Sequence, residues 1–219
     1  SVGNLVFTRV EDQARVYETL SQEGYNGVLV VHAEKESEMD NSIWTPLEPV
    51  THCHARPEKA EIESVKDQIA LAKNYDFGGK MHIAHISSPK AVELVEDARK
   101  DRLNISCGIC PHHLIYDWSK MVGENGVLWK MNPPLRSPES RDQMLEHLKK
   151  GKIDWIETDH APHTLDEKVK KPFMSGISGL PWWNLFDRYL SSKGFTGMEI
   201  RNLTFNNAAN RFGIDVKRT

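Results

Sequence analysis

Short apolar runs alternate along this chain with segments in which apolar residues recur at helical spacing. Val28–Val31 is a continuous apolar run, of the kind found in strands that are buried on both faces of a parallel sheet. Further short strands are expected at 81–87, 103–109 and 153–159. Helices are expected around them, at 10–23, 57–75, 88–100, 137–150, 180–192 and 198–211. The alternation predicts βαβ units and a parallel sheet, which is the α/β class of fold.

Polar side chains follow the apolar part of each expected strand. In chain order they are His32, His85, His112, His113 and Asp159. Asp159 is expected to be the last residue of its strand, because the proline three residues later lacks the amide hydrogen that a continuing strand would need. The carboxyl ends of parallel strands meet at one edge of a sheet, and enzymes of the α/β barrel type keep their chemistry there. We therefore expect these side chains to lie at a common edge.

Two imidazoles and a carboxylate among these residues favour a metal site. His32, His85 and Asp159 offer the ligand types that zinc and similar divalent metals take in hydrolytic sites. The alternative for each histidine alone is a hydrogen-bonded core residue, and for Asp159 it is a strand exit that faces water. Their joint appearance at successive strand ends favours the metal interpretation.

A second cluster joins cysteines to histidines after the third strand. Cys107 and Cys110 form a single CxxC, which His112 and His113 follow. A structural zinc site usually takes four ligands in two properly spaced pairs, and the only other cysteine is Cys53. We therefore do not expect a zinc knuckle here.

The string HCHAR at 52–56 has a spacing that would place two imidazoles, those of His52 and His54, on one face of a strand. It lies in a proline-flanked connection before a helix and not at the end of an apolar strand. We therefore interpret it as unrelated to the metal site.

Composition and charge narrow the classes of function. The chain has 219 residues, a formal net charge of -3 and a pI near 6.4, so no basic surplus favours nucleic acid as a partner. No run reaches the roughly 18 apolar residues of a membrane span. Three cysteines and the absence of a signal-peptide pattern favour a reduced, cytoplasmic compartment. The charge therefore favours small molecules or proteins as partners, and no membrane role is expected. The lack of repeats and linkers predicts one domain, 1–219.

Five separated motifs carry a resemblance to a known family. They are VVHAE, MHIAHISS, CPHHL, NPPLR and TDHAPH, in that order. With them the chain resembles dihydroorotases, of the cyclic amidase branch of the amidohydrolase superfamily, over almost its whole length. The resemblance implies a (β/α)8 TIM-type barrel with one or two zinc ions. It also implies reversible hydrolysis of dihydroorotate to N-carbamoyl-L-aspartate in pyrimidine biosynthesis.

The resemblance also assigns roles to single residues. It implies that His32 and His85 are metal ligands and that Asp159 both binds metal and carries the proton as the catalytic residue. It implies substrate contacts for Asn132 and His163, and for the backbone near Gly176. It gives no role to His160, His112 or His113.

The chain departs from the family pattern at its beginning. The family starts with an HxHxR strand and continues to a strand with a carboxylated lysine or an aspartate, and neither precedes SVGNLVF, which resembles the segment just after that second strand. The resemblance therefore implies the C-terminal half of a barrel, with the N-terminal strands missing. We expect a truncated or cleaved piece, or a chain completed by another chain or in a homo-oligomer, and we expect the piece alone to be inactive. The second metal site would depend on the missing residues.

Two other functions are also compatible with the sequence. An allantoinase or dihydropyrimidinase would share the metal histidines, although TDHAPH and NPPLR favour dihydroorotase. A catalytically inactive, dihydroorotase-like scaffold subunit for aspartate transcarbamoylase would explain the missing HxHxR strand. Such a scaffold would not need His32, His85, Asp159 and His163.

Overall fold

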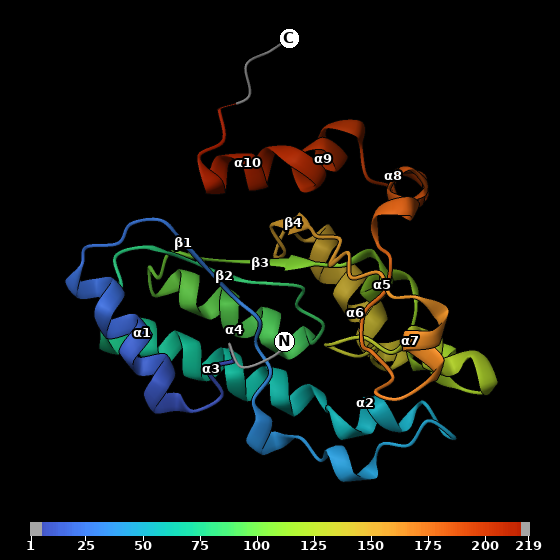
Figure 1. The fold of residues 1–219 in the computed structure, drawn as a ribbon. Helices are drawn as coiled ribbons and strands as arrows, with labels where there is room; N and C mark the ends of the chain where they lie inside the picture. Colours follow the sequence, from blue (N-terminus) through green and yellow to red (C-terminus); the bar gives the residue numbers. More distant parts are fainter. Residues whose placement is uncertain (1–5, 216–219) are drawn as a thin grey trace.

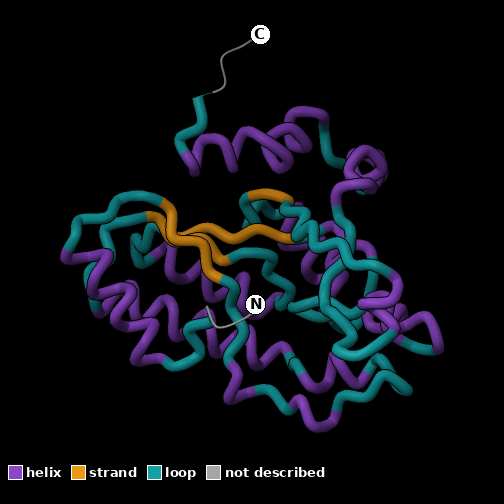
Figure 2. Tube along the Cα trace, viewed as in Figure 1, coloured by secondary structure: helices purple, strands orange, loops and turns teal. Residues whose placement is uncertain are grey.

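A parallel four-stranded sheet forms the centre of the molecule (Figures 1 and 2). The computed structural model describes residues 6–215, without the side chain of Trp182. The strands are β1 (Val28–Val31), β2 (Lys80–Ile83), β3 (Ile105–Ile109) and β4 (Trp155–Ile156), and they lie in the order β1-β2-β3-β4. The predicted α/β class and the sequential parallel sheet are confirmed. The opening segment that resembles the region after the lysine-bearing strand lies largely outside the described residues.

Four longer helices precede or connect the strands. They are α1 (Val10–Gln22), α3 (Glu58–Asn74), α4 (Pro89–Lys100) and α6 (Pro138–Lys149). In Figure 1 α3 and α4 run side by side along one face of the sheet. Each has buried side chains at helical spacing, as the pattern of the sequence predicted. Pro57 precedes the first turn of α3 and does not lie within it.

Shorter helices form the connections and the end of the chain. They are α2 (Thr51–Ala55), α5 (Pro111–Ile115), α7 (Leu165–Val169), α8 (Trp183–Ser192), α9 (Gly197–Arg201) and α10 (Asn207–Phe212). One turn of π-helix at Asn202–Asn206 joins α9 to α10, so the helix expected at 198–211 is present with a change of winding. The connection between α5 and α6 contains two 3₁₀ helices, Trp118–Met121 and Glu124–Trp129. No described helix has the length and apolar character that crossing a membrane requires.

The core lies between the sheet and the long helices. Strands β2 and β3 are buried almost throughout, and they contribute Met81, Ile83 and Ile109. The expectation that Val28–Val31 is buried on both faces is wrong, since the side chain of Val30 is half exposed. In the described part of the chain β1 is an edge strand that pairs with β2 alone, and one of its faces is uncovered.

The fourth strand is shorter than expected. It ends at Ile156, and Asp159 lies three residues beyond it, so the placement of Asp159 as the last strand residue is wrong. β3 ends at Ile109, and the backbone amide of Glu157 still donates to the Ile109 carbonyl at 2.9 Å. The partner strand then turns into α5, whose first residue is a proline, so no further partner is offered to the chain at 158–159.

Candidate metal site and its surroundings

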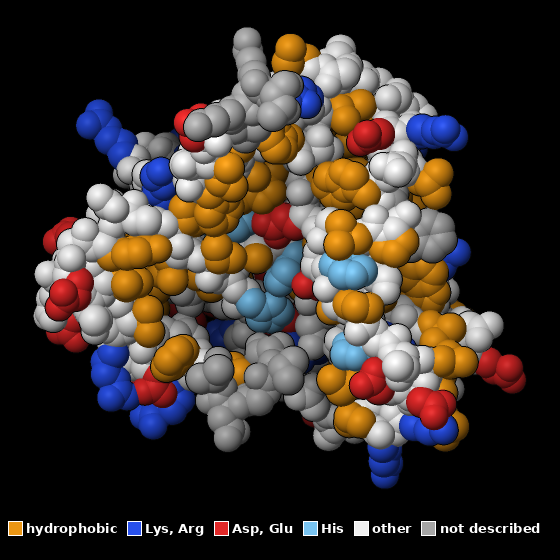
Figure 3. All heavy atoms as spheres, turned by 45° about the horizontal axis from the view of Figure 1, so that its top comes forward, with side chains coloured by type: hydrophobic (Ala, Val, Ile, Leu, Met, Phe, Trp, Pro, Cys, Tyr) orange, Lys and Arg blue, Asp and Glu red, His pale blue; other side chains and the backbone are white. Residues whose placement is uncertain are grey.

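His32 and His85 meet at the carboxyl ends of β1 and β2. The distance from His32 Nδ1 to His85 Nε2 is 3.1 Å, and the two ring centroids are 4.8 Å apart. Figure 3 shows histidine and acidic side chains gathered in a hollow of the surface. The structure thus brings together the two histidines that the sequence analysis predicted as metal ligands.

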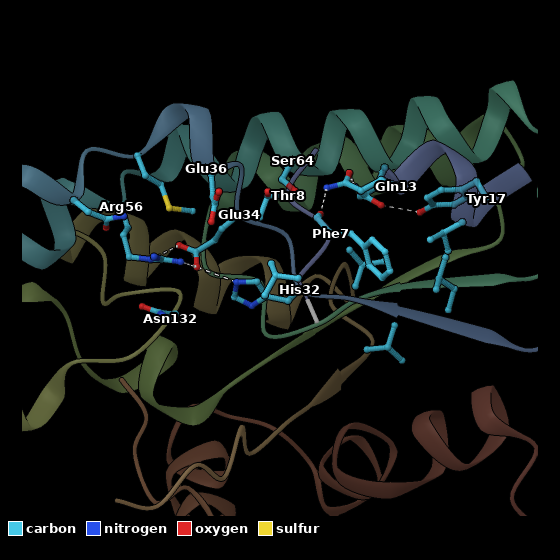
Figure 4. Close-up of a pocket in the computed structure, with 18 residues that line it drawn as sticks. Phe7, Thr8, Gln13, Tyr17, His32, Glu34, Glu36, Arg56, Ser64 and Asn132 are labelled. Carbon is cyan, nitrogen blue, oxygen red and sulfur yellow. Dashed lines mark hydrogen bonds and ion pairs between the residues drawn. The ribbon is translucent and has the colours of Figure 1, made fainter. Parts of the chain in front are cut away.

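A buried carboxylate orients His32. Glu34 Oε2 lies 3.0 Å from His32 Nε2 and 2.6 Å from Arg56 Nη2, and Figure 4 shows the three side chains in a row. Burial would raise the pKa of Glu34, but the hydrogen bond with His32 and the charge of Arg56 hold it far below its usual value. Glu34 therefore stays ionised, and it accepts the Nε2 proton of His32.

The position of His85 is set by its backbone. Its amide donates to Glu157 Oε2 at 2.6 Å, and its φ of 38° lies in the left-handed region that residues other than glycine rarely occupy. Burial and the neighbouring His32 lower the pKa of His85, so the ring is neutral at physiological pH. Its buried Nδ1 has no hydrogen-bond partner among the described residues.

These two histidines fit a zinc ion. Because His32 Nε2 carries the proton given to Glu34, His32 Nδ1 has a free lone pair directed at His85. Two nitrogens bound to one zinc ion in tetrahedral geometry would lie roughly 3.3 Å apart, close to the separation found here. A carboxylate that receives the second ring proton is the usual way in which proteins orient a metal-binding histidine.

Asp159 lies near this pair without closing around it. Its charge acts on His85, where it opposes the lowering of the pKa, and its φ of 41° is again in the left-handed region. Among the described residues, the group of three or more possible ligands whose atoms all lie within 4.8 Å of one another does not include it. Its role as a ligand stays a prediction.

Asn132 is held in place by His52 and lies at the edge of a cavity that His32 also lines. His52 Nε2 is 3.0 Å from both Asn132 Oδ1 and the Met131 carbonyl oxygen, and since both are acceptors, this nitrogen carries the proton. A cavity of about 570 Å³ is lined by both Asn132 and His32. The structure therefore places the predicted substrate residue Asn132 beside the same opening as the predicted ligand His32.

The buried imidazole of His52 is expected to make the free energy of unfolding depend on pH. Burial lowers its pKa from 6.5 to about 4 in the folded protein, so the unfolded chain binds more protons between these values. Stability should therefore fall as the pH falls from 6.5 to 4, with a contribution from His52 on the order of 3 kcal/mol. Urea unfolding across this range measures it. In His52→Gln, whose amide can still donate to both acceptors, the slope should be smaller, and an unchanged slope would contradict the assignment.

His163 and Gly176 lie together in the loop that follows β4. His163 Nε2 is 3.2 Å from the Ser175 carbonyl oxygen. Gly176 has a φ of 142°, and a Cβ there would come within 2.7 Å of Ala161 and 3.1 Å of His163, so only glycine fits. Lys168 donates to the carbonyl oxygens of Gly176 and Lys130, at 2.9 and 2.7 Å, and so joins this loop to the segment that carries Asn132.

The string HCHAR at 52–56 supports the candidate site, but it does not place two histidines on one face as a strand with this spacing would. It forms α2 and the residue after it, and on a helix positions two apart point in different directions. His52 is accordingly buried and His54 exposed. Arg56 ends the string and pairs with Glu34. The roles of Glu34 and Arg56 were not predicted from the sequence, although the acid directly after VVHA was a usable signal.

Comparison of sequences relates the chain to dihydroorotases. It is 36% identical over 202 residues to the dihydroorotase of Methanosphaera stadtmanae, which covers 88% of this chain and 46% of that protein. It is 34% identical over 160 residues to that of Ligilactobacillus salivarius, covering 71% of this chain and 37% of that protein. The chain thus spans less than half the length of these relatives. No protein-family model matches it.

Comparison of structures gives the fold. A D-hydantoinase from Thermus sp. matches 97% of this chain and 48% of its own, with a TM-score of 0.83 and 20% identity. A dihydroorotase from Campylobacter jejuni matches 100% of this chain and 57% of its own, with a TM-score of 0.70 and 18% identity. These are amidohydrolase barrels, and the four βα units described above form part of one. By sequence and fold together, the chain is recognised as a dihydroorotase-like part of an amidohydrolase barrel.

Proposed function

We propose that the complete protein is a zinc-dependent dihydroorotase, which hydrolyses dihydroorotate reversibly to N-carbamoyl-L-aspartate in pyrimidine biosynthesis. The observation that carries the proposal is the pair His32 and His85, joined at two strand ends and oriented by Glu34. The sequence similarity to dihydroorotases supports the choice of substrate. The other half of the barrel would come from the rest of the polypeptide or from another chain, in the cytoplasm.

The proposed chemistry divides between the metal and the side chains. Bound zinc would lower the pKa of water and so supply a nucleophile for the ring amide carbonyl. His32 and His85 would hold the ion, as neutral imidazoles. Asp159 would complete the site, accept the proton of the attacking water and return it to the leaving ring nitrogen. Its charge acts on His85, so a carboxylate at this position would be near a bound ion and could move the proton between the water and the ring nitrogen.

The substrate contacts would come from two joined segments. Asn132 offers an amide and His163 an imidazole, which suit the ring amides and the carboxylate of dihydroorotate. Gly176 lets its backbone lie against Ala161 and His163, because a side chain there would strike both residues. Lys168 holds these segments together through its two carbonyl contacts. The site would therefore be pre-formed on both sides of the substrate.

Activity and metal content of the full-length protein test the proposal. We expect hydrolysis of dihydroorotate, little or none of hydantoin, dihydrouracil or allantoin, and loss of activity after treatment with a chelator. Preference for one of the other cyclic amides would favour the dihydropyrimidinase or allantoinase alternative. A folded, full-length protein that binds no metal and turns over none of these substrates would favour the scaffold alternative, with aspartate transcarbamoylase as the partner to try first.

Glu34→Gln is expected to weaken zinc binding about 10- to 100-fold, which is the usual effect of losing a carboxylate that orients a ligand histidine. Glutamine is neutral, so it cannot balance the positive charge of Arg56, and it would accept the Nε2 proton of His32 less strongly. His32 would therefore be a weaker ligand. Competition with a chromophoric chelator measures the affinity. Glu36→Gln, an exposed neighbour, is the matched control. Equal affinities in the two variants would show that Glu34 does not act through His32.

A further inference from the structure

A second group of possible metal ligands lies at the end of β3. Cys110, His112 and His113 each offer one ligand atom, and these atoms all lie within 4.8 Å of one another. The three side chains are 0%, 5% and 3% exposed. The proposed function gives none of them a role. They sit where β3 ends and α5 begins, so one short stretch of backbone fixes all three.

The two imidazoles leave nitrogen atoms without partners. His112 Nε2 and His113 Nδ1 are buried and have no hydrogen-bond partner within residues 6–215. An unsatisfied buried polar atom typically costs about 1–3 kcal/mol. Two such atoms lie within this one small cluster, where a bound cation would give both of them a partner.

The tautomer of His113 is set in the way that metal binding requires. Its Nε2 lies 3.1 Å from the Pro133 carbonyl oxygen, which can only accept, so Nε2 carries the proton. Nδ1 therefore has a free lone pair. A backbone carbonyl that receives the second ring proton is a common orienting partner of a ligand histidine.

Both rings are neutral under ordinary conditions. Burial lowers the pKa of His112 to about 3, and burial together with the neighbouring His112 lowers that of His113 well below its usual value. Burial raises the pKa of the Cys110 thiol, so no negative charge is present before a cation arrives. Binding would then release the thiol proton to solvent as the sulfur–metal bond forms.

We propose that Cys110, His112 and His113 form a second metal site, for a borderline-soft cation such as Zn²⁺, separate from the His32 and His85 pair. One thiolate and two imidazoles are ligands that zinc takes readily, and three protein ligands leave one position open. His112 also lines a cavity of about 560 Å³ whose walls include Trp129 and Phe186. His112 is thus the member of the cluster that borders a cavity.

Cobalt titration of the full-length protein tests the proposal, with Co²⁺ as the probe. The His32→Ala/His85→Ala background removes the first pair of ligands, which has no sulfur. In this background we expect one equivalent of Co²⁺ to bind with thiolate-to-cobalt charge-transfer absorption. Cys110→Ser should remove that absorption and weaken zinc binding at least 10-fold. Cys107→Ser is the matched control, because this buried thiol in β3 faces the Lys152 carbonyl oxygen; the variant should leave both the absorption and the zinc affinity unchanged.

A second measurement needs no variant, so it tests the proposal even if the variants fail to fold. Zinc-edge X-ray absorption of the unaltered, zinc-loaded protein should show sulfur at about 2.3 Å. Absence of both sulfur scattering and charge-transfer absorption would overturn the proposal, as would identical spectra from Cys110→Ser and Cys107→Ser. None of these measurements depends on dihydroorotate turnover. The second site can therefore fail while the proposed function stands, and the reverse is also true.

Discussion

Asp159→Asn is expected to lower the turnover of dihydroorotate by the complete enzyme about 10²- to 10⁴-fold, the usual contribution of a positioned acid–base group. Asparagine has nearly the same shape but cannot accept and return the proton. It also tolerates the left-handed backbone that residue 159 adopts, so the loop should keep its course. Steady-state kinetics in both directions of the reaction measures the effect.

The control for this variant is Asp187→Asn, at an exposed position of α8. It should leave turnover within twofold of the parent protein. Circular dichroism and zinc content should be compared for both variants, so that a lost fold or a lost ion is recognised. Retention of more than a tenth of the parent activity in well-folded Asp159→Asn would refute its proposed role.

Arg136→Met is expected to lower the free energy of unfolding by about 3–5 kcal/mol, because it leaves a buried carboxylate without its charged partner. Arg136 Nη2 lies 3.3 Å from Glu61 Oε2, and both side chains are almost fully buried. Arg136 also donates to the Ser87 hydroxyl and to the Arg56 carbonyl oxygen, at 2.9 and 2.6 Å. The pair thus ties α3 to the turn after β2. Urea unfolding measures the loss.

The double variant Glu61→Gln/Arg136→Met separates the effect of the unpaired charge on stability from the effect of the lost packing. Removing both charges should recover part of the lost stability, because no unpaired ion then remains in the interior. Arg188→Met, an exposed position, should change stability by less than about 0.5 kcal/mol. A loss below about 1 kcal/mol for Arg136→Met would show that the pair is not needed to hold the turn.

The arrangement of helices and strands could be predicted because local signals marked it. α4 and α6 both begin at a proline that follows a serine, as expected from the sequence. The exposure of Val30 could not be predicted, because an apolar run looks the same whether or not the rest of the molecule covers it. The π-helical turn at Asn202–Asn206 was also missed. Hydrophobic periodicity alone does not distinguish one extra residue in a helical turn.

The candidate site was only partly visible in the sequence. His32 and His85 could be found because each follows an apolar strand, and parallel strands deliver their ends to one edge. The contact of Glu34 with Arg56 joins residues 22 positions apart and depends on how α2 folds back, which no local pattern specifies. The same limit hid Glu157, which directly follows β4 and contacts His82 and the amide of His85 on or just after β2, more than 70 positions away in the sequence.

If His85 and Asp159 have the proposed roles, their left-handed backbone sets stability against activity. A residue other than glycine in this conformation costs of order 1–3 kcal/mol, and glycine would relieve the strain at either position. Selection for thermal stability alone would therefore tend to replace these two side chains, and under the proposed roles the surviving variants would be more stable but inactive. An engineered library of this protein needs an activity screen at every round, since thermostability by itself would select against the chemistry.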